Sequence, residues 1–369
     1  MIGGGLAGLS LSILLARNGH RVVVLEKEYY PFHRVCGEYI SLESRPFLES
    51  LGYPVDKMDL PLIKRLLVSA PNGNTIEHPL PLGGFGISRY KIDADLAQLA
   101  RRNGVEVLEG VRVTDAVLYG PSFRVTATGL SLDARVVVGA WGKRGNLDVK
   151  WKRDFAQKKP GRLNQFIGVK YHIKTDFPAD SIALHNFSGG YCGMSKVEND
   201  TCCLCYLTTA QNLRKAGGSI DRMETEILCR NPRLAAVFAS SAVLWEEPLT
   251  IAQVSFARKR QIENHVLMSG DTAGMITPLC GNGMSMALHA SKLAAPLISR
   301  FLRRQMTRTQ REDEYQRQWT GAFAARLRAG RLIQGFFGND HISNTFIGIM
   351  KPFPKLVSYL ISQTHGQPF

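Results

Sequence analysis

The chain opens with a glycine-rich turn of the kind that binds the phosphates of a dinucleotide. Gly3, Gly5 and Gly8 have the spacing Gly-x-Gly-x-x-Gly, and an apolar, helix-forming segment follows over residues 6–18. In such a turn the first glycine allows a tight bend, the second lets the backbone approach a pyrophosphate, and the third lets the helix pack closely. The N–H groups of the first helical turn then face the phosphates. We therefore predict cofactor contacts from Gly3, Gly5, Leu6, Ala7 and Gly8.

An acidic residue at the end of the next apolar run supports this interpretation. Glu26 follows Val22-Val23-Val24-Leu25, a run typical of a buried parallel strand, and lies eighteen residues after Gly8. A carboxylate at this place accepts hydrogen bonds from a ribose. The glycine pattern alone is weak evidence, but with the helix, the strand and the acid it predicts a dinucleotide-binding α/β domain. We include the next residue, Lys27, among the predicted contacts.

The strand that should precede the glycines is reduced to Met1-Ile2. Such a strand normally runs about five residues through the middle of the sheet. Either the chain starts late, or a neighbouring segment covers the gap. The sequence leaves both alternatives open.

A second glycine-rich segment indicates which dinucleotide is bound. Gly270-Asp271-Thr272-Ala273-Gly274 is followed by Pro278, by Gly281-Asn282-Gly283 and by a helix-forming run over residues 284–302. This arrangement resembles the second FAD motif of the glutathione reductase-type flavoproteins, where the aspartate accepts a hydrogen bond from the ribityl chain. Glycines without Cβ atoms let a backbone lie against a flat ring, and the positive end of the next helix would stabilise an anionic reduced flavin. The resemblance implies FAD contacts from Gly270, Asp271, Pro278, Gly281, Asn282, Gly283 and Met284.

Two further segments narrow the resemblance. Arg34-Val35-Cys36-Gly37-Glu38-Tyr39-Ile40-Ser41 and Ser88-Arg89-Tyr90-Lys91-Ile92-Asp93 resemble the geranylgeranyl reductase-like branch of the p-hydroxybenzoate hydroxylase-fold flavoenzymes. That fold group also contains aromatic hydroxylases and flavin-dependent halogenases. The motifs cover about the first 150 residues and residues 250–300. The resemblance implies further cofactor contacts from Arg34, Arg89 and Val113.

The same resemblance gives two catalytic candidates, Cys36 and Glu38. Related reductases place a cysteine facing the flavin where this chain has Cys36, and Glu38 lies two residues further on. A thiol there would donate a proton to the carbanion left by hydride transfer, or would only pack against the ring. Both interpretations stay open. Hydroxylation needs no protein base in its oxygen-transfer step, because the flavin carries that chemistry.

Three departures from the family patterns limit the prediction. Where relatives have Ala-Asp-Gly, this chain has Ala140-Trp141-Gly142, so NAD(P)H binding in the usual manner is not expected; Lys143 and Arg144 would instead meet phosphates by charge. The reductase pattern Tyr-x-Trp-x-Phe-Pro is replaced by Tyr191-Cys192-Gly193-Met194-Ser195-Lys196. None of the four tryptophans forms the halogenase pattern Trp-x-Trp-x-Ile-Pro, so halogenation is not expected.

The electron donor is a separate question. No second Gly-x-Gly-x-x-Gly follows a predicted strand, so the chain has no separate dinucleotide domain for a reductant. We expect one permanently bound FAD that is reduced by NAD(P)H or by another, transiently docking donor.

Composition excludes several classes. Lys and Arg number 46 and Asp and Glu 31, a net charge of +15 over 369 residues. The basic residues are scattered and no compact nucleic-acid motif occurs, so nucleic acid is not an expected partner. An anionic membrane surface, or an anionic cofactor and substrate, explains the charge. No apolar run reaches the ~18 residues that span a bilayer, and no basic segment precedes an apolar run as in a signal peptide. We expect a cytoplasmic protein, with peripheral membrane contact as an alternative.

The seven cysteines predict neither disulfides nor a metal site. Cys202 and Cys205 have Cys-x-x-Cys spacing but lie in a predicted strand, where residues three apart point to opposite faces. Packed free thiols in a reducing compartment are expected.

The elements predict an interleaved α/β fold. A glutathione reductase-type, Rossmann-like FAD-binding domain takes residues 1–60, 88–150 and 251–300. An antiparallel β-sheet substrate-binding domain takes residues 61–87 and 151–250, and residues 301–369 form a C-terminal helical segment. The expected elements are a hairpin of residues 63–70 and 75–79, strands 166–173, 181–187 and 201–207, and helices 94–102, near 220–229 and 284–302.

The C-terminal segment carries an apolar helical face. Tyr315, Trp319, Phe323 and Leu327 recur every four residues with arginines beside them, and residues 300–369 hold eleven Lys and Arg and four Asp and Glu, a net charge of +7. These helices either cover the FAD-binding domain or form a partly exposed apolar surface with a basic rim. Such a surface would meet a membrane or admit a long hydrophobic substrate.

These observations predict an FAD-dependent monooxygenase, a hydroxylase, acting on a hydrophobic polyketide, aromatic or isoprenoid compound. The first alternative is a flavin-dependent ene-reductase of the geranylgeranyl reductase type. An alternative of a different class is a catalytically idle flavoprotein or a membrane-associated binding protein.

Overall fold

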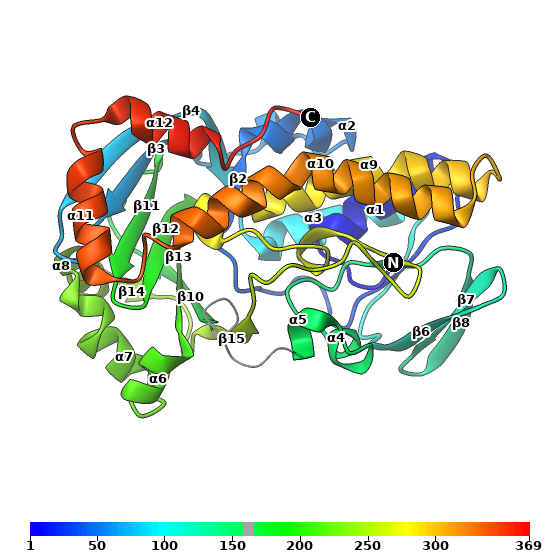
Figure 1. Cartoon of the computed structure of the whole chain (residues 1–369), viewed down its shortest axis with the longest axis horizontal. Coiled ribbons are helices and arrows are strands. Elements are labelled where there is room, and N and C mark those ends of the chain that lie inside the picture. The colour runs from blue at the N-terminus through cyan, green and yellow to red at the C-terminus, as the bar shows by residue number, and fades with distance from the viewer. Residues whose placement is uncertain (158–165) are drawn as a thin grey trace.

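The glycine-rich start of the chain folds into a turn and a buried helix. In the computed structural model, which describes residues 1–157 and 166–369, α1 (Leu6–Arg17) packs against α3 (Arg89–Arg102) and α9 (Gly283–Leu302). Figure 1 shows these helices as one layer with α10 (Arg308–Gln334). Helix α3 starts five residues before the expected Ala94, because the Ser88 hydroxyl caps it by accepting a hydrogen bond from Lys91 N–H at 3.1 Å.

Short parallel strands lie beneath this helical layer. Strand β1 (Val23–Leu25) pairs with β5 (Glu106–Leu108), and β9 (Val138–Gly139) pairs with β17 (Val266–Met268). Ile2 joins the two pairs through parallel bridges to Leu25 and Gly139. β16 (Ile262–Glu263) extends this sheet, and β6 (Val113–Tyr119), β7 (Ser122–Ala127) and β8 (Leu130–Ala134) form an antiparallel sheet beside it.

The place of the shortened first strand is only partly filled. A cavity of about 410 Å³ lies beside Met1 and Ile2, between residues 21–23 and residues 134–138. The Met1 ammonium donates a hydrogen bond to Val23 O at 2.6 Å, and burial lowers its pKa to about 5. The cavity lies next to the short first strand, and the two alternatives for the missing part of that strand both stay predictions.

The second layer is one large sheet. Within the described residues nine strands form it, in the order β14-β10-β13-β12-β11-β3-β4-β2, with β15 also pairing with β10. Neighbouring strands are antiparallel except β3 and β11, which are parallel. The prediction of a fully antiparallel sheet is therefore wrong at this pair, where the early hairpin pairs with the later strands. The strands are β2 (Tyr39–Ser41), β3 (Leu62–Ser69), β4 (Thr75–Gly86), β10 (Phe166–Lys174), β11 (Ser181–Phe187), β12 (Gly190–Val197), β13 (Thr201–Thr209), β14 (Ala242–Val243) and β15 (Leu249–Val254).

Short helices cover the outer parts of both layers. The helix expected near 220–229 is α7 (Ile220–Glu226) followed by a 3-10 turn (Leu228–Arg230). Residues 158–165, which belong to the expected 151–250 segment, lie outside the described residues. The other short helices are α2 (Arg45–Ser50), α4 (Asn146–Lys150), α5 (Asp154–Gln157), α6 (Ala210–Lys215) and α8 (Pro232–Ser240).

The structure shows where the aromatic face of the C-terminal segment lies. Tyr315, Trp319, Phe323 and Leu327 of α10 are buried, and Tyr315 Oη donates a hydrogen bond to Met268 O at 2.7 Å. This face therefore covers the predicted FAD-binding segment, and the exposed apolar side chains of the C-terminal helices lie elsewhere, between residues 332 and 359. Helices α11 (Asp340–Met350) and α12 (Pro354–Ser362) instead pack over β4 at one end of the large sheet (Figure 1).

Candidate functional site

The first turn of α1 offers unpaired hydrogen-bond donors. Gly5 precedes the helix without a side-chain cap, and the N–H groups of Leu6, Ala7 and Gly8 have no partner among the described residues. Gly3 has a φ of 100°, and a Cβ on Gly8 would lie 2.1 Å from Gly3 O. A helix start with free N–H groups and no acidic residue in its first turn is a binding site for an anion such as a pyrophosphate.

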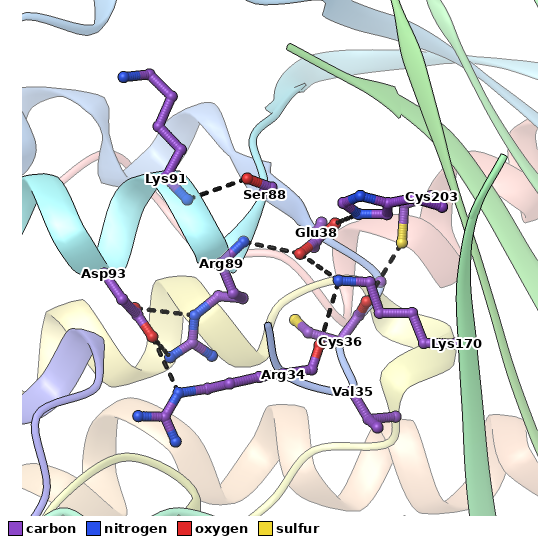
Figure 2. A network of polar contacts seen from close by, with 12 residues as sticks. Arg34, Val35, Cys36, Glu38, Ser88, Arg89, Lys91, Asp93, Lys170 and Cys203 are labelled. Carbon is purple, nitrogen blue, oxygen red and sulfur yellow. Dashed lines mark hydrogen bonds and ion pairs between the residues drawn. The ribbon is translucent and has the colours of Figure 1, made fainter. Parts of the chain in front are cut away.

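Two buried carboxylates hold arginines beside this turn. Glu26 accepts a hydrogen bond from Gly4 N–H at 2.8 Å and pairs with Arg34 at 3.1 Å. Asp93 pairs with Arg34 at 3.0 Å and with Arg89 at 2.6 Å (Figure 2). A Cβ atom on Gly5 would lie 3.2 Å from the Arg89 guanidinium. This cation therefore lies next to the part of the turn that has no side chain.

Two further predicted contacts, Lys27 and Val113, have other partners. Lys27 is exposed and pairs with Glu28 at 2.8 Å. Val113 is buried at the start of β6, and its carbonyl accepts a hydrogen bond from the Asn146 side chain at 2.8 Å. Within the described residues, the Lys27 side chain forms its ion pair with Glu28 and none with Glu26.

The second predicted FAD segment packs closely against its neighbours at positions occupied by glycine. A Cβ on Gly270, whose φ is 62°, would lie 3.2 Å from the Ala7 Cβ, and Asp271 follows in the same 3-10 turn (Gly270–Thr272). Pro278 starts a second 3-10 turn (Pro278–Cys280), and the left-handed Gly281 ends it. A Cβ there would lie 3.0 Å from the ring of Tyr39, and one on Gly283 would lie 4.0 Å from Asp271 Oδ1.

The start of α9 contains buried polar atoms without partners. Asn282 is fully buried; its Nδ2 donates to Thr364 O at 2.9 Å, but its Oδ1 has no partner among the described residues. The Ser285 hydroxyl, also buried, is likewise unpartnered within the described chain. Met284 is buried between them. Because buried polar atoms are normally hydrogen-bonded, these atoms indicate a polar ligand at this helix start.

Each carbonyl group in the loop of residues 34–38 accepts a hydrogen bond. Side chains from distant segments donate to four of them, and the fifth accepts from a backbone N–H group. The pairs are Lys170 Nζ to Arg34 O at 3.2 Å, Lys143 Nζ to Val35 O at 2.7 Å, Cys203 Sγ to Cys36 O at 3.3 Å, Ser195 Oγ to Gly37 O at 3.4 Å and Ile87 N to Glu38 O at 3.0 Å. Figure 2 shows this loop between α3 and the large sheet.

The N–H groups of the same loop remain available. Those of Val35, Cys36 and Gly37 have no partner among the described residues, and a Cβ on Gly37 would meet no atom within 4 Å. A loop fixed by its carbonyls therefore presents donors to open space, which fits the polar edge of a flavin. Together with the bare helix start and the unpartnered Asn282 Oδ1, these residues fit FAD.

Glu38 forms the most buried ion cluster in this region. One carboxylate oxygen accepts hydrogen bonds from Lys170 Nζ at 2.5 Å and Arg89 N at 2.7 Å, and the other lies 2.6 Å from His172 Nε2. Burial alone would raise the pKa of Glu38, but the charge of Lys170 and the hydrogen bond from His172 outweigh it and lower the pKa to about 2. Since both oxygens are engaged, the geometry argues against Glu38 as a proton donor to a substrate.

His33, Glu38 and His172 have ligand atoms within 4.8 Å of one another, a spacing that would suit a metal ion. The Lys170 ammonium, however, already neutralises Glu38 and would repel a cation. The His33 and His172 rings instead pack on Trp245 at centroid distances of 4.5 and 4.6 Å. Burial beside Lys170 lowers the pKa of His33 to about 4. The cluster is therefore an ion pair covered by aromatic rings.

Trp141 fills the place where relatives carry an aspartate. Its ring packs on Gly139 and Gly145, and its Nε1 donates a hydrogen bond to Asp148 Oδ2 at 3.0 Å. The two basic residues after it are engaged elsewhere: Lys143 donates to Val35 O and Arg144 to the Gln253 side chain. The expectation that Lys143 and Arg144 meet phosphates is thus not supported by these contacts.

A buried lysine adjoins the second FAD segment. Lys259 donates hydrogen bonds to Lys143 O at 2.9 Å and to Asp271 O at 2.7 Å, and burial lowers its pKa to about 8. Lys259, Lys170, His172 and Asp93 were missed by the sequence prediction. Lys170 could have been predicted from the sequence, because a lysine within the otherwise apolar and aromatic interior of strand β10 would need a charged partner when buried.

An apolar cavity of about 120 Å³ lies between the large sheet and the C-terminal helices. Strands β3, β4 and β11 form one wall, and α11 and α12 form another. Leu279, Cys280 and Gly281 close its inner end, so the cavity adjoins the second FAD segment. Burial raises the pKa of the Cys280 thiol to about 11, so this thiol stays protonated at neutral pH.

The comparisons with known proteins agree with this geometry. The family described as "FAD binding domain" matches residues 1–318, so the chain belongs to that FAD-binding flavoenzyme family. This finding supports FAD as the cofactor and confirms the α/β fold class with its Rossmann-type domain, several sheets and C-terminal helices.

Curated relatives are distant and carry different names. The chain is 24% identical over 352 residues to "Conditioned medium factor receptor 1" of Dictyostelium discoideum, covering 87% of this chain and 67% of that protein. It is 22% identical over 357 residues to "Tryptophan 2-halogenase" of Chondromyces crocatus, covering 91% and 67%. It is 22% identical over 319 residues to "Digeranylgeranylglycerophospholipid reductase" of Methanoculleus marisnigri, covering 81% and 76%.

Solved structures with the same fold include flavin-dependent halogenases. A triple mutant of the brominase Bmp2 superposes with a TM-score of 0.79 at 20% identity, covering 99% of this chain and 94% of that one. The halogenase PltM in complex with phloroglucinol and FAD gives 0.77 at 16% identity, covering 98% and 81%. The chain spans 62% of the halogenase CmlS, which gives 0.72 at 20% identity. These likenesses show the fold alone.

Proposed function

We propose that the protein is an FAD-dependent monooxygenase that hydroxylates a hydrophobic polyketide, aromatic or isoprenoid compound. The apolar cavity is the observation that carries this proposal. Its wall is aliphatic and aromatic over most of its surface, yet it includes Leu279, Cys280 and Gly281 beside the FAD segment. An apolar substrate in this cavity would therefore lie next to the flavin site, away from water.

The residues of the chain would bind, orient and exclude water. When bound and reduced, FAD supplies the reaction with dioxygen and the oxygen transfer. The free N–H groups of Leu6, Ala7 and Gly8 would bind the pyrophosphate, and Asp271 would accept a hydrogen bond from the ribityl chain, as the resemblance implies. The carbonyl-anchored loop 34–38 would orient the flavin edge.

Labelled dioxygen tests the reaction. The protein is loaded with FAD, reduced chemically, and mixed with isotopically labelled dioxygen, with chloride and bromide, and with a panel of hydrophobic phenols, polyketides and isoprenoids. A monooxygenase yields a product that gains one labelled oxygen atom, measured by mass spectrometry. A product that gains two hydrogens and no label identifies an ene-reductase, and one that gains a halogen identifies a halogenase. A protein that binds FAD but converts no compound on the panel would be catalytically idle.

The ene-reductase of the geranylgeranyl reductase type is the second candidate. The similarity to the digeranylgeranylglycerophospholipid reductase and the half-buried thiol of Cys36 favour it. Reduction of a carbon–carbon double bond needs a proton after hydride transfer, and Cys36 would donate it. We rank this candidate second, because β12 lacks the reductase pattern over Tyr191–Lys196. Cys36→Ser should abolish reduction but leave hydroxylation nearly unchanged.

The electron donor is part of the proposal. NAD(P)H or another donor would reduce the flavin by docking transiently, since Trp141 occupies the place of the aspartate that relatives use. The indole is held by Asp148, which in turn pairs with the buried Arg153 at 2.8 Å. An indole at this place supplies no carboxylate, so we expect slow direct reduction by NADPH.

A further inference from the structure

Large apolar side chains gather on the outer side of the C-terminal helices. Among the described residues, seven of the fifteen large hydrophobic side chains that are exposed lie between residues 332 and 359. Helix α12 is mostly apolar and yet contains no buried residue. We define the apolar patch as Leu332, Phe336, Ile342, Ile349, Phe353, Leu356 and Tyr359.

The patch is connected through the packing of these helices. The rings of Phe336 and Phe346 stack at a centroid distance of 4.9 Å, which joins the end of α10 to α11. Ile342 and Ile349 are seven residues apart on α11 and therefore share a helix face. Helices α11 and α12 are in contact, so the side chains of both contribute to one region. Exposed apolar surface of this extent marks an interaction site.

The same helices form a wall of the apolar cavity. Phe346, Ile347 and Met350 of α11 line it, as do Val357, Leu360 and Ile361 of α12. The two helices thus have the cavity on one side and the apolar patch on the other. The helices that carry the apolar patch therefore also line the predicted substrate site.

Basic residues accompany the patch. Lys351 and Lys355 are exposed between its members, and neither has a carboxylate within ion-pair distance among the described residues. Between residues 332 and 359 the sequence has one acidic residue, Asp340, at the start of α11. An apolar surface with cations at its edge matches the interface of an anionic bilayer, where the headgroups meet the acyl chains.

We propose that the apolar patch docks on an anionic lipid bilayer and that hydrophobic substrates pass from the lipid between α11 and α12 into the cavity. The docking goes beyond the proposed function, whereas the entry route rests on it. A second copy of the chain fits the patch less well, because a two-fold contact would bring the unpaired Lys351 and Lys355 near the same lysines of the partner. Anionic headgroups would neutralise them. Among the described residues, no helix has the length and apolar composition needed to cross a bilayer, so docking would be peripheral.

Vesicle co-sedimentation tests the docking. The FAD-loaded, full-length protein is mixed with vesicles of phosphatidylcholine, alone or with phosphatidylserine, at low and high salt. The wild type should bind the anionic vesicles and be released as salt rises. Because each lysine near such a surface contributes roughly fivefold in affinity, K351Q/K355Q should lower the partition coefficient roughly 25-fold on anionic vesicles and little on neutral ones. F353S/Y359S should lower it on both.

Matched variants control for charge and for exposed apolar area. Arg214 and Lys215 are an exposed basic pair on α6, and Tyr119 is an exposed aromatic residue at the end of β6. R214Q/K215Q and Y119S should bind like the wild type. Equal loss in control and patch variants, or a wild type that stays in the supernatant with anionic vesicles at low salt, would overturn the proposal. A dimer that F353S/Y359S dissolves would assign the patch to a second copy instead.

A separate measurement distinguishes the entry route from docking. Benzene dissolved in the vesicles should transfer to the wild-type cavity, whereas Leu360→Trp should dock normally and take up at least several-fold less benzene, because the indole would occupy the cavity. Docking without any uptake by the wild type would contradict the proposed cavity function. Uptake from solution without docking would contradict the membrane proposal alone.

Discussion

Replacing Lys170 by methionine should expose the cost of an unpaired charge at Glu38. Both side chains are fully buried, and the methionine retains most of the volume of the lysine stem while removing its ammonium. The shift of the Glu38 pKa from 4.5 to about 2 corresponds to about 3 kcal/mol of stabilisation of the charged form. Breaking a buried pair by removing one partner typically costs about 3–5 kcal/mol. We therefore expect Lys170→Met to lower the free energy of unfolding by that amount.

The pH dependence follows from the same pair. In the wild type the pKa of Glu38 is lower in the folded protein than in the unfolded chain, so its contribution is present above about pH 4.5 and is lost as the pH falls toward 2. In Lys170→Met, burial without the ammonium would raise this pKa. The variant should then regain part of its lost stability between about pH 7 and pH 5, because Glu38 can protonate.

Urea unfolding, followed by circular dichroism, measures these changes. Arg65→Met at the exposed Arg65–Asp180 pair is the matched control and should cost no more than about 1 kcal/mol. The double variant Glu38→Gln/Lys170→Met, which buries no charge, should be more stable than the sum of the single changes predicts. Strict additivity, or a cost for Lys170→Met as small as that of Arg65→Met, would refute the reasoning.

Three further predictions concern the cofactor and the first strand. Asp271→Ala should weaken FAD binding by about 1.5–3 kcal/mol through loss of a charge-assisted hydrogen bond; equal affinities in fluorescence titration would contradict the assignment. Trp141→Asp should speed flavin reduction by NADPH relative to Trp141→Ala. Reduction of the wild type at ~10 per second would contradict the hypothesis that loss of the aspartate slows this step. Adding about five apolar, β-forming residues before Met1 should raise the melting temperature and flavin occupancy, because they would enter the cavity of about 410 Å³ and move the terminal amino group out of a place whose burial disfavours its charged form. If the extension changes neither quantity, the added residues do not pair with β1 and β9.

The parts of the fold that depend on local patterns were predictable. The glycine turn, α1 and β1 follow from spacing and apolar periodicity within the first 26 residues, and α9 follows from the second FAD segment. The Ser88 cap was missed, although a serine before a helix is a local signal, so α3 was placed too late. The parallel β3–β11 pair was missed for a different reason, because pairing between distant strands leaves no local trace.

The aromatic face of α10 shows the limit of periodicity. A repeat of four residues predicted that Tyr315, Trp319, Phe323 and Leu327 share one side of a helix, and they do. It could not tell whether that side meets protein or solvent, since both need the same apolar stripe. The residues that do remain exposed, on α11 and α12, have a less regular pattern.

The candidate site likewise contains residues that local sequence predicts and residues that it does not. Residues predicted to contact a cofactor through backbone geometry, such as Gly3 and Gly281, could be read from the sequence because glycine is favoured at a positive φ and where a Cβ would collide. Residues that hold the site in place could not, because their partners come from remote segments: Lys170 and Ser195 lie on the large sheet, yet they bind carbonyls of the loop 34–38. That loop would lie against the flavin only if the large sheet packs against the predicted FAD-binding segments in the arrangement described above. The buried Glu38–Lys170 pair therefore links the two layers, and a loss of stability on its removal should be accompanied by weaker FAD binding.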